Sequence, residues 1–208
     1  DNTTLAKTGN VITLSITSRE AIKTPSVSIA GQAADTVTGS GTSWSATYEM
    51  SDSDSDNVSV SLSISFSDLA GNAGTAVDNT TNGSAVRFDN TDPELSSVTI
   101  ASNNSVSTMA KTGDNITLSF TSSEAIQTPT VTIAGHDVTE TGDNRTWSAV
   151  YTMTSNDSDS GSQKLVSLNI EFKDLAGNPG SAVTSTIGGS AVLFDKTPPG
   201  LTGGTEFT

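Results

Sequence analysis

Residues 7–31, KTGNVITLSITSREAIKTPSVSIAG, return with few changes as residues 111–135, KTGDNITLSFTSSEAIQTPTVTIAG. Within this stretch apolar residues alternate with polar ones, as at Ile12, Leu14 and Ile16. A period of two predicts a β-strand with one buried face, and the Gly, Asn and Thr-Pro positions between the runs predict turns. The stretch therefore indicates a duplicated all-β unit.

The same alternation continues through both copies, at residues 44–50, 60–66 and 86–88 in the first and 147–153, 166–172 and 192–194 in the second. No helical period competes with it. Half-buried strands separated by turn residues are typical of an antiparallel β-sandwich. Trp44 and Trp147 alternate with apolar neighbours, so we expect them in the two cores rather than on sugar-binding surfaces.

The alignment of the copies sets the domain boundaries. We expect a first domain at residues 1–90, a second at 91–197, and a linker or the start of a further strand at 198–208. Residues 91–104, TDPELSSVTIASNN, have no counterpart in the first copy, so the first strand of that domain is missing. Two interpretations stay open: the chain is a piece of a longer array, or a strand is donated between molecules.

The composition limits the functions to consider. The formal charge of −14 disfavours nucleic acid and anionic membrane surfaces as partners and favours cations. No apolar run is long enough to span a membrane, and no signal peptide begins the chain. Cysteine is absent, which excludes disulfides and thiol chemistry. His136 is the single histidine and is expected in a surface loop; no set of catalytic residues repeats, so we expect no enzyme activity.

Three kinds of acidic segment recur between the expected strands. The first is FDNTDPEL at residues 88–95, where Asp89, Asp92 and Glu94 cluster at the joint between the copies; its counterpart is FDKTPPGL at 194–201. Clustered carboxylates at a joint between rigid domains either repel or hold a cation, and hard oxygen ligands suit Ca²⁺. We therefore expect a calcium ion at this joint.

The second segment is FSDLAGNAG at 66–74, repeated as FKDLAGNPG at 172–180. Its Asp68 or Asp174 either closes a tight turn or points at an ion. The third is SREAI at 18–22, repeated as SSEAI at 122–126, which places Glu20 and Glu124 in an end loop. Taken alone, each of these glutamates is expected to be a solvated carboxylate.

The strings SEAI, W-x-A-x-Y, F-x-D-x-AGN and FD-x-T-x-P, in this order, resemble the tandem immunoglobulin-like repeats of large bacterial surface adhesins. The resemblance covers nearly all of both copies and implies two immunoglobulin-like antiparallel β-sandwiches in an elongated array. It also implies that the loop with Glu124, the loop with Asp174 and Asn178, and the linker with Asp89 and Asp92 meet at one pole. This arrangement resembles the calcium junctions between cadherin domains in its principle, though not in its sequence.

The corresponding pole of the first domain has only Glu20, Asp68 and Asn72, because no linker precedes it. The second linker has Pro198 and Gly200 where the first has Asp92 and Glu94, so it is a poorer ligand donor. The acidic stretches SDSDSDN at 51–57 and SNDSDSG at 155–161 match the D-x-D-x-D-G calcium loop only weakly. We expect both to be mobile, solvated turns.

These observations lead to a functional hypothesis. We expect an extracellular or cell-surface spacer in an adhesin, stiffened by Ca²⁺, whose partners are calcium and the neighbouring repeats of the same protein. Millimolar extracellular calcium would saturate even a weak site. One alternative is a filament subunit that associates head to tail by strand donation, using the tail at residues 201–208. The other is a sugar- or protein-binding module.

Overall fold

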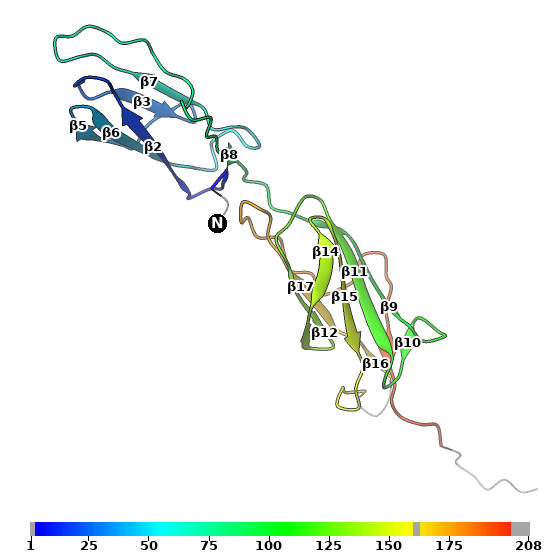
Figure 1. Cartoon of the computed structure of the whole chain (residues 1–208). Coiled ribbons are helices and arrows are strands. Elements are labelled where there is room, and N and C mark those ends of the chain that lie inside the picture. The colour runs from blue at the N-terminus through cyan, green and yellow to red at the C-terminus, as the bar shows by residue number, and fades with distance from the viewer. Residues whose placement is uncertain (1–2, 160–162, 201–208) are drawn as a thin grey trace, which may run out of the picture. The chain divides into compact units, whose positions relative to one another are not determined.

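The computed structural model describes residues 3–159 and 163–200, so the tail expected to donate a strand lies outside the described residues. Every regular element in the described part is a β-strand, and none of it forms a helix long and apolar enough to cross a membrane. The chain divides into two compact units. One comprises Asp1–Thr91 with Leu175–Asn178, and the other Asp92–Asp174 with Pro179–Thr208. Within each, strands form two facing layers (Figure 1).

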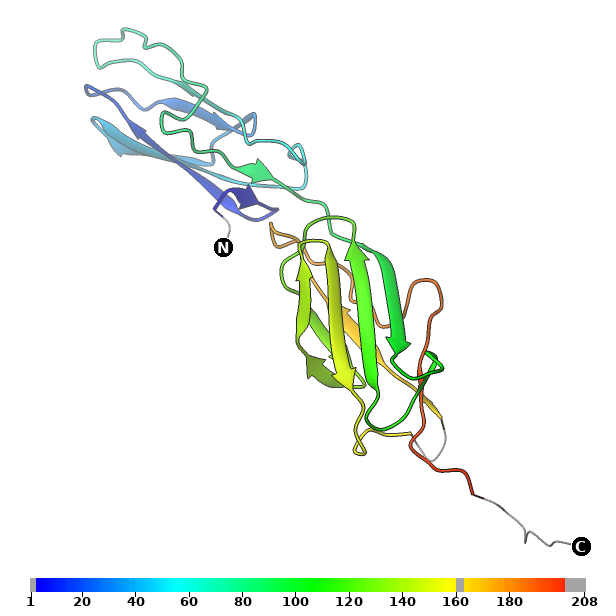
Figure 2. The same cartoon turned by 45° about the vertical axis from the view of Figure 1, so that its right-hand side comes forward.

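The larger sheet of the second unit has four antiparallel strands in the order β14-β15-β11-β9 (Figure 2). They are β9 (Leu95–Ser102), β11 (Asn115–Ser122), β14 (Glu140–Asp143) and β15 (Thr146–Thr152). Strand β11 has a neighbour on each edge, since Leu118 pairs with Ile100 of β9 and with Ala149 of β15. Its inward side chains are consequently covered from both sides.

The facing layer of the second unit contains the remaining strands. They are β10 (Met109–Ala110), β12 (Thr130–Ile133), β13 (His136–Val138), β16 (Lys164–Leu165), β17 (Leu168–Glu171) and β18 (Leu193–Phe194). Strands β13, β12 and β17 form one ladder, and β10, β18 and β16 form another, with β10 parallel to β18. The larger sheet thus contains β9, β11, β15 and β14, and it faces β12, β17 and β18. In an immunoglobulin-like sandwich the first, second, fifth and fourth strands likewise face the third, sixth and seventh.

The first unit repeats this sandwich without a counterpart of β9 among its described residues. One layer has the order β2-β6-β5, and the other β4-β3-β7, with the parallel pair β1-β8. The strands are β1 (Leu5–Ala6), β2 (Val11–Thr17), β3 (Ser26–Ile29), β4 (Gln32–Ala33), β5 (Thr36–Ser40), β6 (Ser43–Glu49), β7 (Leu62–Ser65) and β8 (Arg87–Phe88). The chain is thus two tandem immunoglobulin-like β-sandwiches, as the alternation and the resemblance predict.

The two cores differ because one lacks the covering strand. Leu118 of β11 is fully buried, whereas Leu14 at the same place in β2 is half-buried and packs at the margin of its core. Trp147 is a core residue, as expected, but Trp44 is only half-buried, so the expectation of a buried Trp44 is wrong. Side chains that alternate correctly are buried fully only where a neighbouring strand covers them.

The F-x-D-x-AGN-x-G motif also has a packing explanation. In the second unit the Phe172 ring lies directly against Gly180, and a Cβ added there would overlap the ring. The Gly180 amide donates to the Phe172 carbonyl at 3.0 Å, which closes the loop between them. Gly177, inside the turn, has φ +98°, a conformation that L side chains rarely adopt. Phe66 and Gly74 repeat the same packing in the first unit.

Candidate functional site

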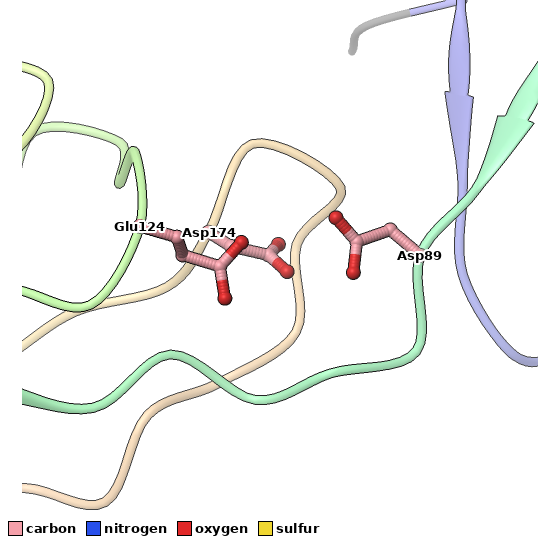
Figure 3. Close-up of side chains that lie close together, drawn as sticks. All are labelled: Asp89, Glu124 and Asp174. Carbon is pink, nitrogen blue, oxygen red and sulfur yellow. The ribbon is translucent and has the colours of Figure 1, made fainter. Parts of the chain in front are cut away.

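Two loops of the second unit bring Glu124 and Asp174 together. The loop after β11 is bridged to the end of the β17 segment by antiparallel pairing of Ile126 with Asp174. Gln127 strengthens this closure, because its amide donates to the Lys173 carbonyl at 2.9 Å and its Nε2 to the Asp174 carbonyl at 2.8 Å. As a result, carboxylate oxygens of Glu124 and Asp174 lie within 4.8 Å of each other (Figure 3).

The linker that leads into the second unit runs beside the same loop. Glu94 and Ser123 are bonded in both directions: the Glu94 amide donates to Ser123 Oγ at 3.0 Å, and the Ser123 amide donates to the Glu94 carbonyl at 2.7 Å. Ser123 is the residue before Glu124, so the linker is anchored next to that carboxylate. The Asp92 side chain, expected to be a ligand, is exposed.

Asp89, which Figure 3 also labels, directly follows β8 in the first unit. Its amide donates to the Ala6 carbonyl at 2.8 Å, and its Oδ1 accepts from the Thr91 amide at 3.3 Å. The Asp89 carbonyl accepts from Asn178 Nδ2 at 2.8 Å, a contact inside the same compact unit. Asp89 is 9 % exposed and Asn178 5 %. These bonds hold the backbone of Asp89 beside Ala6 and Asn178.

A pair of carboxylates this close has a definite electrostatic preference. Two negative charges about 5 Å apart repel by roughly 3 kcal/mol at an effective dielectric constant of 20. Asp174 is only 1 % exposed, so solvent screens its charge poorly. A divalent cation coordinated by both groups converts this repulsion into attraction, and carboxylate, amide and backbone carbonyl oxygens are the ligands that Ca²⁺ takes.

The matching loops of the first unit are joined by the same backbone pairing, but the aspartate side chain there binds its own turn. Ile22 bridges Asp68 as Ile126 bridges Asp174. The Asp68 carboxylate, however, accepts bonds from the Gly71 amide at 2.7 Å, the Asn72 amide at 2.8 Å and Asn72 Nδ2 at 2.7 Å. The side-chain bond from Asn72, supported by the backbone bonds, lowers the pKa of Asp68 below its usual value.

Among the residues expected at the first pole, Glu20 is exposed. The Asp68 carboxylate and the Asn72 amide are used on each other. The equivalent amide of the second copy, Asn178 Nδ2, donates to the Asp89 carbonyl, which belongs to the same compact unit.

The expectation of mobile, solvated turns at 51–57 and 155–161 is wrong for Asp54, Asp157 and Asp159, which are buried, whereas Asp52 and Asp56 are exposed. Asp54 is 8 % exposed, and its carboxylate accepts the Tyr48 hydroxyl at 2.9 Å and the Ser51 amide at 2.7 Å. Burial first, and then the hydrogen bond to Asp54, raises the pKa of Tyr48. Because these groups already donate to Asp54, its carboxylate holds the loop against β6 rather than binding calcium. We call this set of hydrogen bonds, from a tyrosine hydroxyl and a loop amide to one aspartate, the clasp.

Asp157 makes the same clasp in the second unit, with the Tyr151 hydroxyl at 3.1 Å and the Thr154 amide at 2.6 Å. Burial alone would raise the pKa of Asp157, but bonds from Thr154, His136 and Tyr151 outweigh it and lower the pKa. His136 lies in strand β13, not in a loop as expected, and its exposed ring stacks on Tyr151. The histidine thus covers the clasp.

A second pair of aspartates was missed in the sequence. Asp56 accepts the Asn90 amide at 2.7 Å and the Thr91 hydroxyl at 2.6 Å, and these bonds lower its pKa. In the second unit, Asp159 Oδ2 likewise accepts the Thr197 hydroxyl at 2.9 Å. The signal was available, since aspartates two residues apart recur in both acidic loops and FD-x-T recurs after both last strands. Both aspartates thus bind the segment that directly follows the last strand of their sandwich.

Comparisons with known proteins concern the fold. No family model matches the chain, and no curated protein matches it. Among solved structures, the fibronectin(III)-like modules of Clostridium thermocellum CbhA match with a TM-score of 0.39 and 8 % identity over 97 % of this chain and 94 % of that one.

Two tandem immunoglobulin domains of titin match with a TM-score of 0.30 and 9 % identity over 93 % of this chain and 92 % of that one. A Bacteroides ovatus protein, SGBP-B of the mixed-linkage glucan utilization locus, solved with a mixed-linkage heptasaccharide, matches with a TM-score of 0.23 and 13 % identity over 92 % of this chain and 42 % of that one. Such similarities say nothing of function.

Proposed function

We propose that this chain is a spacer segment of an extracellular adhesin, in which Ca²⁺ stiffens the connection between consecutive immunoglobulin-like domains. The observation that carries the proposal is the pairing of the Glu124 and Asp174 carboxylates in two loops of the second unit, beside the anchored linker. The chain has no repeated catalytic set and two copies of one β-sandwich, which favours a mechanical role. The bacterial surface origin rests on the resemblance of the repeated motifs.

Calcium is the cation that suits these groups. The candidate ligands are all oxygens, and the chain as a whole carries a formal charge of −14, which attracts divalent cations. A thiolate or histidine site for zinc is not available, because cysteine is absent and the single histidine, His136, is bonded to Asp157. Extracellular modules of this kind bind calcium at roughly 0.1 to 1 mM, a range that extracellular fluids saturate.

Asp89 is the third ligand in this proposal. Glu94, anchored on Ser123, follows Asp89 by five residues, and a stretch of that length spans at most about 18 Å. Asn178, which bonds the Asp89 carbonyl, follows Asp174 by four residues and spans at most about 14 Å. In this proposal the linker and the hydrogen bond from Asn178 let the Asp89 carboxylate join the pair as the third ligand.

The mechanical consequence follows from the charges. Without a cation, three carboxylates repel one another and favour conformations of the linker in which they are apart. A bound Ca²⁺ removes this repulsion and joins the linker to the two loops, so the hinge loses conformational freedom. Stiffness then depends on calcium concentration, as a spacer that works only outside the cell requires.

Calorimetric titration of the whole chain with CaCl₂, followed by thermal unfolding with calcium or with chelator, tests the proposal. Binding to the folded state alone should stabilise the second unit by about 2.7 kcal/mol at a hundredfold excess over Kd. Glu124→Gln and Asp174→Asn should abolish the gain, because each removes a charged oxygen ligand while keeping the size of the side chain.

Glu20→Gln and Asp68→Asn are the matched controls in the first unit and should leave most of the gain. Small-angle scattering reports the stiffness directly, as a narrower distribution of maximum dimensions in calcium. The proposal is refuted if calcium gives no binding heat, no change in unfolding and no change in scattering.

A further inference from the structure

The first unit has an open groove on one side of its sandwich. Its volume is about 740 Å³, and its floor is made by apolar side chains of both layers. Leu14 and Ile16 come from β2, and Leu62 and Ile64 from β7, with Phe66 beyond the end of β7. Since Leu14, Ile16, Leu62 and Phe66 are all only half-buried, the groove exposes part of the core.

In the second unit the corresponding place is filled by β9. Val98 is fully buried and Ile100 is 5 % exposed, and both belong to the hydrophobic core. The backbone of β9 is bonded on both edges. One edge pairs with β11 along its length, and on the other the Ile187 amide donates to the Val98 carbonyl at 2.9 Å and Ser190 Oγ accepts the Ile100 amide at 3.0 Å.

Both rims of this arrangement are already formed in the first unit. Strand β2 stands where β11 does, and the loop at 79–84 corresponds to the loop that borders β9. The Thr80 hydroxyl donates to the Ser84 carbonyl at 2.6 Å, which repeats the bond from Thr186 to Ser190 at 2.6 Å. Thr81 and Ser84, the counterparts of Ile187 and Ser190, line the groove.

We propose that this groove binds one extended peptide strand, antiparallel to β2, with apolar side chains at two alternate positions. Strand β9 sets the register, because Val98 pairs with Phe120 and Ile100 with Leu118. The two apolar residues of the bound strand therefore stand opposite Ile16 and Leu14. Backbone bonds to β2 and to the 79–84 loop supply affinity, and the two apolar side chains supply the preference for this sequence pattern.

Arg19, Glu20 and Asp68 line one end of the groove, so charges of both signs lie there and give it no charge preference. The pattern that we assign to the ligand is consequently a strand with two alternating apolar residues.

Residues 91–104 of this chain carry that pattern and serve as the probe. A variant chain with a copy of TDPELSSVTIASNN placed before residue 1 should raise the melting temperature of the first unit by at least about 5 °C. The amide protons of β2 should exchange at least tenfold more slowly. In the matched control, the valine and isoleucine of the added copy are replaced by aspartate, and both effects should disappear.

The same peptide, added in solution to the unaltered chain, should shift the NMR resonances of β2 and of the 79–84 loop while leaving those of β11 in place. Equal stabilisation by the aspartate control, or unchanged β2 exchange in the fused chain, overturns the proposal. Sedimentation of the unaltered chain as a dimer with protected β2 amides also overturns it, because a second copy would then be the occupant.

Discussion

Leu14 and Leu118 occupy the same position in the two units, but strand β9 covers only Leu118. Comparing their truncation therefore measures how much β9 contributes to the stability of its unit. Leu118→Ala removes a fully buried side chain that lies between β9 and β15. Leu→Ala at such a site costs about 3 to 4 kcal/mol, from lost burial and the cavity that remains. Leu14→Ala, at a half-buried site beside the groove, should cost about 1 to 2 kcal/mol.

Differential scanning calorimetry of the full chain separates these effects. For a domain of about 100 residues, 1 kcal/mol shifts the melting temperature by roughly 4 °C or more. Leu118→Ala should therefore lower the transition of the second unit by about 12 °C or more and leave that of the first in place. Leu14→Ala should lower only the first transition, by about 4 to 8 °C. Equal shifts for the two variants would show that β9 does not account for the difference in burial.

Three further outcomes follow from the contacts. Gly180→Ala should destabilise the second unit by about 1 to 3 kcal/mol in urea unfolding, because the new methyl group overlaps the Phe172 ring; a neutral result would contradict the packing explanation of the motif. Asp157→Ala should cost about 1 to 3 kcal/mol by leaving Tyr151 and the nearby amides unpaired, yet leave calcium binding intact by calorimetric titration. The lowered pKa values of Asp56 and Asp157 mean that their stabilising contribution is complete above the ordinary value of 3.8 and is lost as pH falls through the folded-state pKa. Circular dichroism should therefore show constant stability from pH 7 to about 5 and a decline below about pH 4, which Asp56→Asn should make shallower.

Much of the fold could be predicted from the sequence because its signals are local. Alternation at Ile12, Leu14 and Ile16 depends only on the pleat of a strand, and a duplicated pattern must give a duplicated sandwich. The pairing of the loops that carry Glu124 and Asp174 was accessible too, since it follows from where strands end in an immunoglobulin-like sandwich. The missing counterpart of β9 was visible as a gap in the alignment.

Burial and hydrogen-bond partners were decided by the tertiary structure alone. Trp44 and Trp147 occupy the same place in the W-x-A-x-Y motif, yet of the two Trp147 alone lies in a closed core. The sequence predicts solvated carboxylates at Asp54 and Asp157, because acidic runs usually lie in solvent. In the folded loops, however, both carboxylates accept hydrogen bonds from a tyrosine hydroxyl and a backbone amide. The sequence thus determined which residues face inward, through a period of two. Which of them are covered, and which carboxylates meet a donor or another carboxylate, depended on chain segments far away in sequence, because burial and electrostatics act through space.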